Sequence, residues 1–256
     1  MVDEHRPPVL RDEVRVGLDG ARDHDFTEPE GRHFDPVFKP DEWSDWSMVK
    51  WTIKNNCREL IDNVADMAHF YYVHFAFPTS FRNVFDGHTA TQFMESKGRP
   101  DKSEGGYSGE DSTLKSEATY FGPAYMINWL EVDYKGFVTE VILINCHIPT
   151  GPDSFTLQYG IAVKKPEGLD EKTVDYIAER YTESFGDGFL QDVAIWENKV
   201  AVQNPLLCEE DGPVYQLRRW YEQFYTDVAE LKPEMTDRFE FDVDTTSANV
   251  YWHAEV

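Results

Sequence analysis

Two histidines and several amide or carboxylate side chains share one short stretch of this chain that is otherwise apolar and aromatic. The stretch runs from Asp62 to His74 and includes Asn63, Asp66 and His69. Polar groups in such surroundings cost free energy unless something binds them. Two neutral imidazoles and one carboxylate form the ligand set of mononuclear non-haem iron(II) sites, so the stretch is a candidate metal centre.

The spacing of these residues limits how they can meet. Asp66 and His69 are three residues apart and share one face of a helix. His69 and His74 are separated by about 140° around the axis of an ideal helix. They therefore converge on one ion only if the helix breaks or bulges between them. The alternative interpretation is a pair of core histidines that are hydrogen-bonded to the backbone.

A third ligand has two candidates on a second predicted helix, residues 189–200. Asp192 and Glu197 flank the apolar stripe of this helix on opposite sides. Helical geometry does not choose between them, and each alone also fits a solvated surface position.

The composition of the chain argues against several classes of protein. The 48 acidic and 24 basic residues give a formal net charge of −24, which argues against binding to nucleic acid. The sequence has no apolar run long enough for a membrane span, and its N-terminus has no apolar core of a signal peptide, so we expect a cytoplasmic protein. Cys57, Cys146 and Cys208 are widely spaced, which favours free thiols and leaves no cysteine pair to hold an iron–sulfur cluster.

The pattern of residue types predicts an α+β domain. Residues 1–45 are rich in proline and charge and are expected to be an extended arm, followed by one folded domain at residues 46–256. Helical spacing predicts one helix from Cys57 to about Phe75, ended by Pro78. Alternating patterns predict antiparallel strands at residues 43–55, 89–96, 123–133, 137–149, 155–163 and 238–243. Further helices are expected at residues 170–185 and 189–200, at part of residues 213–231, and at the C-terminus; Gly186 and Gly188 separate the first two.

Several motifs resemble one family of enzymes. The run from Asn56 to His74 resembles Rieske non-haem iron oxygenases, and more narrowly the oxygenase component of 3-ketosteroid 9α-hydroxylases. The other matching segments are residues 120–129, 144–147, 188–193 and 204–216. The resemblance extends from about residue 41 to the C-terminus. It implies a helix-grip fold, in which an antiparallel sheet wraps around a long helix and holds a mononuclear iron.

The resemblance also assigns roles to residues. It implies that His69, His74 and Asp192 are the iron ligands, and that Asp66 and Asn63 belong to the catalytic machinery. Asp66 matches the aspartate that bridges a ligand histidine to the cluster of a neighbouring subunit. The residues implied to surround the steroid are Gln92, Tyr120, Met126, Asn128, Asn145, Phe189 and Trp196. Independently of the resemblance, Met126 with Asn128 and Leu143 with Asn145 share predicted strand faces of mostly apolar character, as in a ligand pocket.

The chain departs from the family at its N-terminus, where about 45 residues of arm stand in place of a Rieske domain. We therefore expect a catalytic subunit of a heteromeric steroid oxygenase that uses O₂ at a mononuclear Fe(II). A homologous partner subunit is expected to carry the 2Fe-2S cluster, which a ferredoxin-type reductase reduces, in a ring with three copies of each chain. The second hypothesis is a non-catalytic steroid-binding or structural subunit. The start at Met1 and the unrelated arm favour a natural chain over a fragment.

Overall fold

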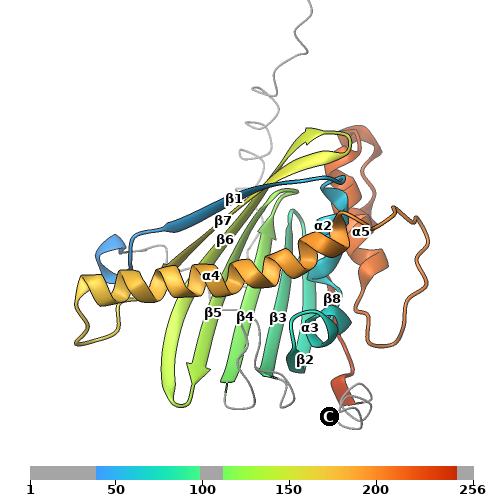
Figure 1. Cartoon of the computed structure of the whole chain (residues 1–256). Coiled ribbons are helices and arrows are strands. Elements are labelled where there is room, and N and C mark those ends of the chain that lie inside the picture. The colour runs from blue at the N-terminus through green and yellow to red at the C-terminus, as the bar shows by residue number, and fades with distance from the viewer. Residues whose placement is uncertain (1–38, 99–111, 247–256) are drawn as a thin grey trace, which may run out of the picture. The chain divides into compact units, whose positions relative to one another are not determined.

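The computed structural model describes residues 39–98 and 112–246, in which one antiparallel sheet is crossed by a long helix, α4 (Figure 1). Within these residues the sheet has eight strands in the order β1-β7-β6-β5-β4-β3-β2-β8. The strands are β1 (Ser47–Ile53), β2 (Ala76–Asp86), β3 (Thr89–Gly98), β4 (Ser112–Phe121), β5 (Tyr125–Tyr134), β6 (Phe137–Gly151), β7 (Ser154–Val163) and β8 (Phe239–Asp242). The helical segments are η2 (Pro40–Glu42), α2 (Arg58–Ile61), η3 (Asp62–Val64), α3 (Ala68–Tyr72), α4 (Glu171–Trp196), α5 (Val214–Glu222), η4 (Gln223–Tyr225), η5 (Val228–Glu230) and α6 (Pro233–Thr236). The predicted α+β class is confirmed.

The register of the strands builds the wall of the site. Met126 of β5 lies opposite Asn145 of β6, and Asn128 lies opposite Leu143, so the four side chains share one face of the sheet. Met126, Leu143 and Asn145 are buried. The alternation that the sequence shows in these two strands thus places apolar and amide side chains together under α4.

Helix α4 is a single helix of 26 residues and not the two helices expected around Gly186 and Gly188. Asp170 begins the helix by accepting a hydrogen bond from the backbone N–H of Thr173. A Cβ atom at Gly186 would lie only 2.3 Å from the hydroxyl oxygen of Tyr159 on β7. Gly186 therefore allows α4 to lie close to the sheet, and the burial gained there outweighs the low helix propensity of glycine.

The expected helix from Cys57 to Phe75 is also wrong, because tertiary contacts divide it into α2, η3 and α3. Between η3 and α3 the chain pairs with a distant segment: Gly212 donates its N–H to the carbonyl of Ala65 at 2.8 Å, and Asp66 forms a β-bridge with Asp211. Pro78, expected to end the helix, lies inside β2.

Two strands, β2 and β4, were not predicted. Along β4 the inward positions alternate between small polar and apolar residues, so hydrophobic alternation is weak, and β4 is recognisable only from its pairing with β3 and β5. Of the expected arm, the structure describes residues 39–45; Trp43 and Ser44 are buried there, and the backbone N–H of Ser44 bonds the carbonyl of Val163 at 2.8 Å. Most of the expected C-terminal helix lies outside the described residues. None of the helices in the described ranges combines the length and apolar character needed to cross a membrane.

Candidate metal centre

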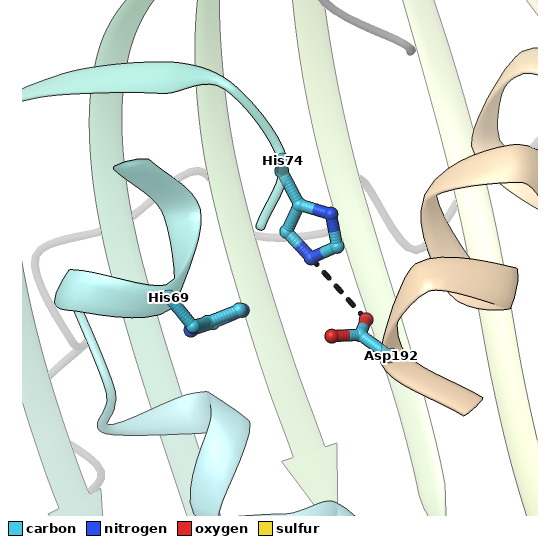
Figure 2. Close-up of side chains that lie close together, drawn as sticks. All are labelled: His69, His74 and Asp192. Carbon is cyan, nitrogen blue, oxygen red and sulfur yellow. Dashed lines mark ion pairs between the residues drawn. The ribbon is translucent and has the colours of Figure 1, made fainter. Parts of the chain in front are cut away.

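His69, His74 and Asp192 meet between α3 and the C-terminal half of α4 (Figure 2). Each offers one ligand atom, and the three atoms lie within 4.8 Å of one another. His74 Nε2 is 3.2 Å from Asp192 Oδ2, and the centroids of the two imidazole rings are 5.1 Å apart. The structure thus gathers two imidazoles and one carboxylate, the donor set that suits a mononuclear non-haem iron(II).

The end of helix α3 lets histidines five residues apart converge. The last α-helical residue is Tyr72, and the carbonyl of His69 accepts from the backbone N–H groups of Val73 at 2.7 Å and His74 at 3.4 Å. The second bond spans five residues, as in a π-turn. Phe75 then adopts a left-handed conformation with φ of 56° and turns the chain into β2. The helix therefore breaks where the spacing requires it to break.

Hydrogen bonds at the far side of each imidazole select its tautomer. His69 Nδ1 lies 2.5 Å from the backbone carbonyl oxygen of Asp66, and His74 Nδ1 lies 3.3 Å from Oε1 of Gln191. Because a carbonyl oxygen only accepts, each Nδ1 carries the proton and donates it. Nε2 of both rings is left with a lone pair for a metal.

The carboxylate of Asp192 is held by an amide. Asn63 Nδ2 donates to Asp192 Oδ1 at 3.2 Å, and the indole N–H of Trp196 donates to Asn63 Oδ1 at 3.4 Å. The indole thus fixes which end of the Asn63 amide faces Asp192, and Oδ2 of Asp192 stays directed at His74. The alternative ligand, Glu197, accepts instead from the backbone N–H of Lys54 at 3.2 Å.

Asp66 acts on His69 mainly through its backbone. Its carboxylate accepts from the backbone N–H of His69 at 3.1 Å, but Oδ1 is 3.9 Å from the ring Nδ1. The carboxylate therefore caps the start of α3, and the backbone carbonyl orients the ring. Its side chain is 32% exposed and reaches solvent beside the metal site.

The surroundings shift the pKa values of the two imidazoles in opposite directions. Burial lowers the pKa of His69, which favours the neutral ring that a metal needs. Burial would also lower the pKa of His74, but the hydrogen bond and charge of Asp192 raise it above its ordinary value. The carboxylate of Asp192 thus favours the protonated form of His74 as long as no metal is bound, and a metal would take the place of that proton.

A pocket of about 920 Å³, measured with its opening to solvent, adjoins these residues. All seven residues implied to surround the steroid line it: Gln92, Tyr120, Met126, Asn128, Asn145, Phe189 and Trp196. Their part in steroid binding stays a prediction. Sequence reasoning missed much of the rest of the lining, including Phe70, Met94, Leu114, Ser116, Phe185 and Gln191. Gln191 could have been found from its place beside Asp192, whereas Ser116 lies on β4, a strand that was not predicted.

Comparison with known proteins identifies relatives of this chain. The family model described as the 3-Ketosteroid 9alpha-hydroxylase C-terminal domain matches residues 23–225, so the match begins inside the expected arm. A 3-ketosteroid-9-alpha-monooxygenase oxygenase component of Rhodococcus rhodochrous is 59% identical over 217 residues, which are 84% of this chain and 57% of the relative. The oxygenase component of Mycobacterium tuberculosis is 54% identical over 222 residues, 86% of this chain and 58% of the relative. The chain thus spans less than two thirds of the length of these relatives.

Two solved structures share the fold. NdmA of Pseudomonas putida CBB5 with caffeine superposes with a TM-score of 0.53 at 14% identity, over 82% of this chain and 61% of that chain. Dicamba monooxygenase bound to dicamba gives a TM-score of 0.50 at 16% identity, over 72% and 58%. At these identities the likeness concerns the fold alone.

Proposed function

The chain belongs to the family of the 3-ketosteroid 9α-hydroxylase C-terminal domain, and on this premise we propose that it is the catalytic chain of a Rieske-type monooxygenase that hydroxylates 3-ketosteroids or related steroids. The observation that carries the proposal is the meeting of His69, His74 and Asp192 beside a mostly apolar pocket. The sheet with α4 across it is consistent with a helix-grip fold.

The donor set fits iron(II). His69, His74 and Asp192 would hold the ion through two imidazole nitrogens and one carboxylate, each already oriented by a neutral hydrogen-bond partner. Bound by these residues, iron(II) would supply the activation of O₂. The chain itself orients the ligands, and the burial of His69 favours its neutral form.

The lining of the pocket suits an apolar ligand. Its walls are mostly apolar, as is usual for small-molecule sites. A few amides interrupt them: Asn128 accepts from the Ser116 hydroxyl at 2.9 Å, while Oδ1 of Asn145 is buried without a hydrogen-bond partner among the described residues. A buried polar atom without a partner is available to bind a ligand or a water molecule. Such groups would fix the orientation of a steroid, and orientation decides which carbon is attacked.

Electrons for this chemistry are proposed to come from a 2Fe-2S cluster on another chain. The 256 residues include three cysteines, and no two of them form a Cys-x-x-Cys pair. Asp66 supports the proposal, because its side chain is bonded to His69 and still reaches solvent. It would touch a Rieske-bearing homologous subunit in a ring of three copies of each chain, with a ferredoxin-type reductase feeding the cluster.

Co-expression with a Rieske-bearing homologue from the same host tests this function. We expect the two chains to co-purify and, with reductase and O₂, to hydroxylate a 3-ketosteroid, whereas a complex containing His69→Ala should lose both iron and turnover. Full activity of this chain with the reductase alone would refute the requirement for a Rieske-bearing partner subunit. Steroid binding by the purified chain without any iron would instead support a non-catalytic binding subunit.

A further inference from the structure

Four charged side chains from four segments meet beside the metal site, and we call them the ion-pair cluster. They are Glu59 of α2, Asp62 of η3, Lys199 just after α4, and Arg218 of α5. The guanidinium of Arg218 binds the carboxylate of Asp62 through two bonds, from Nε at 2.9 Å and from Nη2 at 2.7 Å. Lys199 Nζ lies 2.6 Å from Asp62 Oδ2 and 3.1 Å from Glu59 Oε2. Two positive charges thus balance two negative charges.

The cluster is largely removed from water. The side chains of Glu59 and Asp62 are 9% and 13% exposed. Burial would raise the pKa of Asp62, but its bonds to Arg218 and the charge of Lys199 lower it below the ordinary value. The loss of hydration offsets most of the attraction in such a buried group, so its clearest use is to select one geometry rather than to add stability.

The geometry that it selects includes the hydrogen bond between Asn63 and Asp192. Asp62 directly precedes Asn63 in η3. On the other side of that bond, Lys199 follows the end of α4, the helix that carries Asp192. Asn55 also bonds the carbonyl oxygen of Lys199 at 3.0 Å. Both partners of the bond are therefore tied to the same cluster.

We propose that the ion-pair cluster is a positioning device for the metal centre, in which Arg218 and Lys199 hold Asp62 so that Asn63 orients the carboxylate of Asp192. The proposal rests on the proposed metal-binding function. The loss of an outer hydrogen-bond partner typically weakens metal affinity about 10–100-fold, and we expect Asp62→Asn to weaken it by about tenfold.

Competition between the full-length chain and a chromophoric chelator for Co²⁺ tests the proposal, with thermal unfolding followed in parallel. Asp62→Asn should lose Co²⁺ affinity, and Arg218→Lys, which keeps the charge but not the two-bond geometry, should lose less. Arg238→Met is the matched control. It removes ion pairs to Asp86 and Glu240 that lie outside the pocket lining, so it should leave Co²⁺ affinity unchanged.

A double-mutant cycle separates positioning from general destabilisation. If the cluster acts through Asn63, adding Asp62→Asn to Asn63→Ala should weaken Co²⁺ binding little further, whereas the losses of thermal stability should still accumulate. Two results would overturn the positioning role of the cluster and leave the metal centre standing. One is full additivity of the affinity losses, and the other is an Asp62→Asn protein whose Co²⁺ affinity stays within twofold of wild type. A wild-type chain that binds no Co²⁺ overturns the metal centre and this proposal with it.

Discussion

The close approach of α4 to the sheet at Gly186 makes a sharp prediction about stability. A Cβ atom at Gly186 would lie 2.3 Å from the Tyr159 hydroxyl, whereas a Cβ atom at Gly188 would meet its nearest neighbour, His74 Nδ1, at an ordinary 3.7 Å. Overpacking costs about 1–3 kcal/mol, and alanine improves on glycine in a helix by about 1 kcal/mol. We therefore expect Gly186→Ala to destabilise the protein by about 1 kcal/mol net and Gly188→Ala to stabilise it by about 1 kcal/mol.

The two alanine variants should thus differ by about 2 kcal/mol, which is about 4–8 °C in Tm for a protein of this size. Tyr159→Phe supplies the rescue, because the next atoms around the added Cβ are Tyr159 Cζ at 3.5 Å and Trp51 Cη2 at 3.7 Å. The Tyr159→Phe variant by itself loses the hydrogen bond from the Tyr159 hydroxyl to the carbonyl of Thr182, at a cost of about 1 kcal/mol.

In the Tyr159→Phe background, Gly186→Ala should become stabilising, as measured by urea and thermal unfolding. Since α4 carries Asp192, Gly186→Ala should also weaken Co²⁺ binding, and the double variant should restore it. Equal stabilities of the two alanine variants, or no change of sign with Tyr159→Phe, would refute the close approach.

Three further predictions concern the surroundings of the metal site. Phe75 has a left-handed backbone, so the β-branched Phe75→Val should lose more thermal stability and Co²⁺ affinity than Phe75→Gly, and equal losses would contradict the role of this turn. The pKa of Asp62 is lowered in the folded state, so its stabilising contribution is present at neutral pH and is lost as the pH falls below about 4. The difference in urea stability between wild type and Asp62→Asn should therefore shrink below about pH 4, and a difference that does not depend on pH would contradict this contribution. Trp196→Phe removes the N–H that orients the amide of Asn63 and should weaken Co²⁺ binding up to about tenfold, whereas wild-type affinity would show that the indole is not needed.

The residue types indicated a candidate metal centre before any fold was known. Two imidazoles and nearby carboxylates in an apolar segment indicated a metal centre, and the requirement that the helix end between His69 and His74 followed from geometry alone. The alternating residues of β5, β6 and β7 determined the sheet, because side-chain direction in a strand depends only on parity. These features are local, so they can be read from neighbouring residues.

Only the tertiary structure decided how distant segments meet. Helical periodicity left Asp192 and Glu197 as equal candidates, and the fold turned Asp192 toward the histidines while Glu197 bonds Lys54. It also joined two expected helices into α4, because close contact with Tyr159 explains Gly186 better than a helix break does. The divided segment before His69 depends on pairing with residues near Gly212. Such outcomes follow from contacts between residues that are distant from each other in the chain, where packing outweighs local propensity.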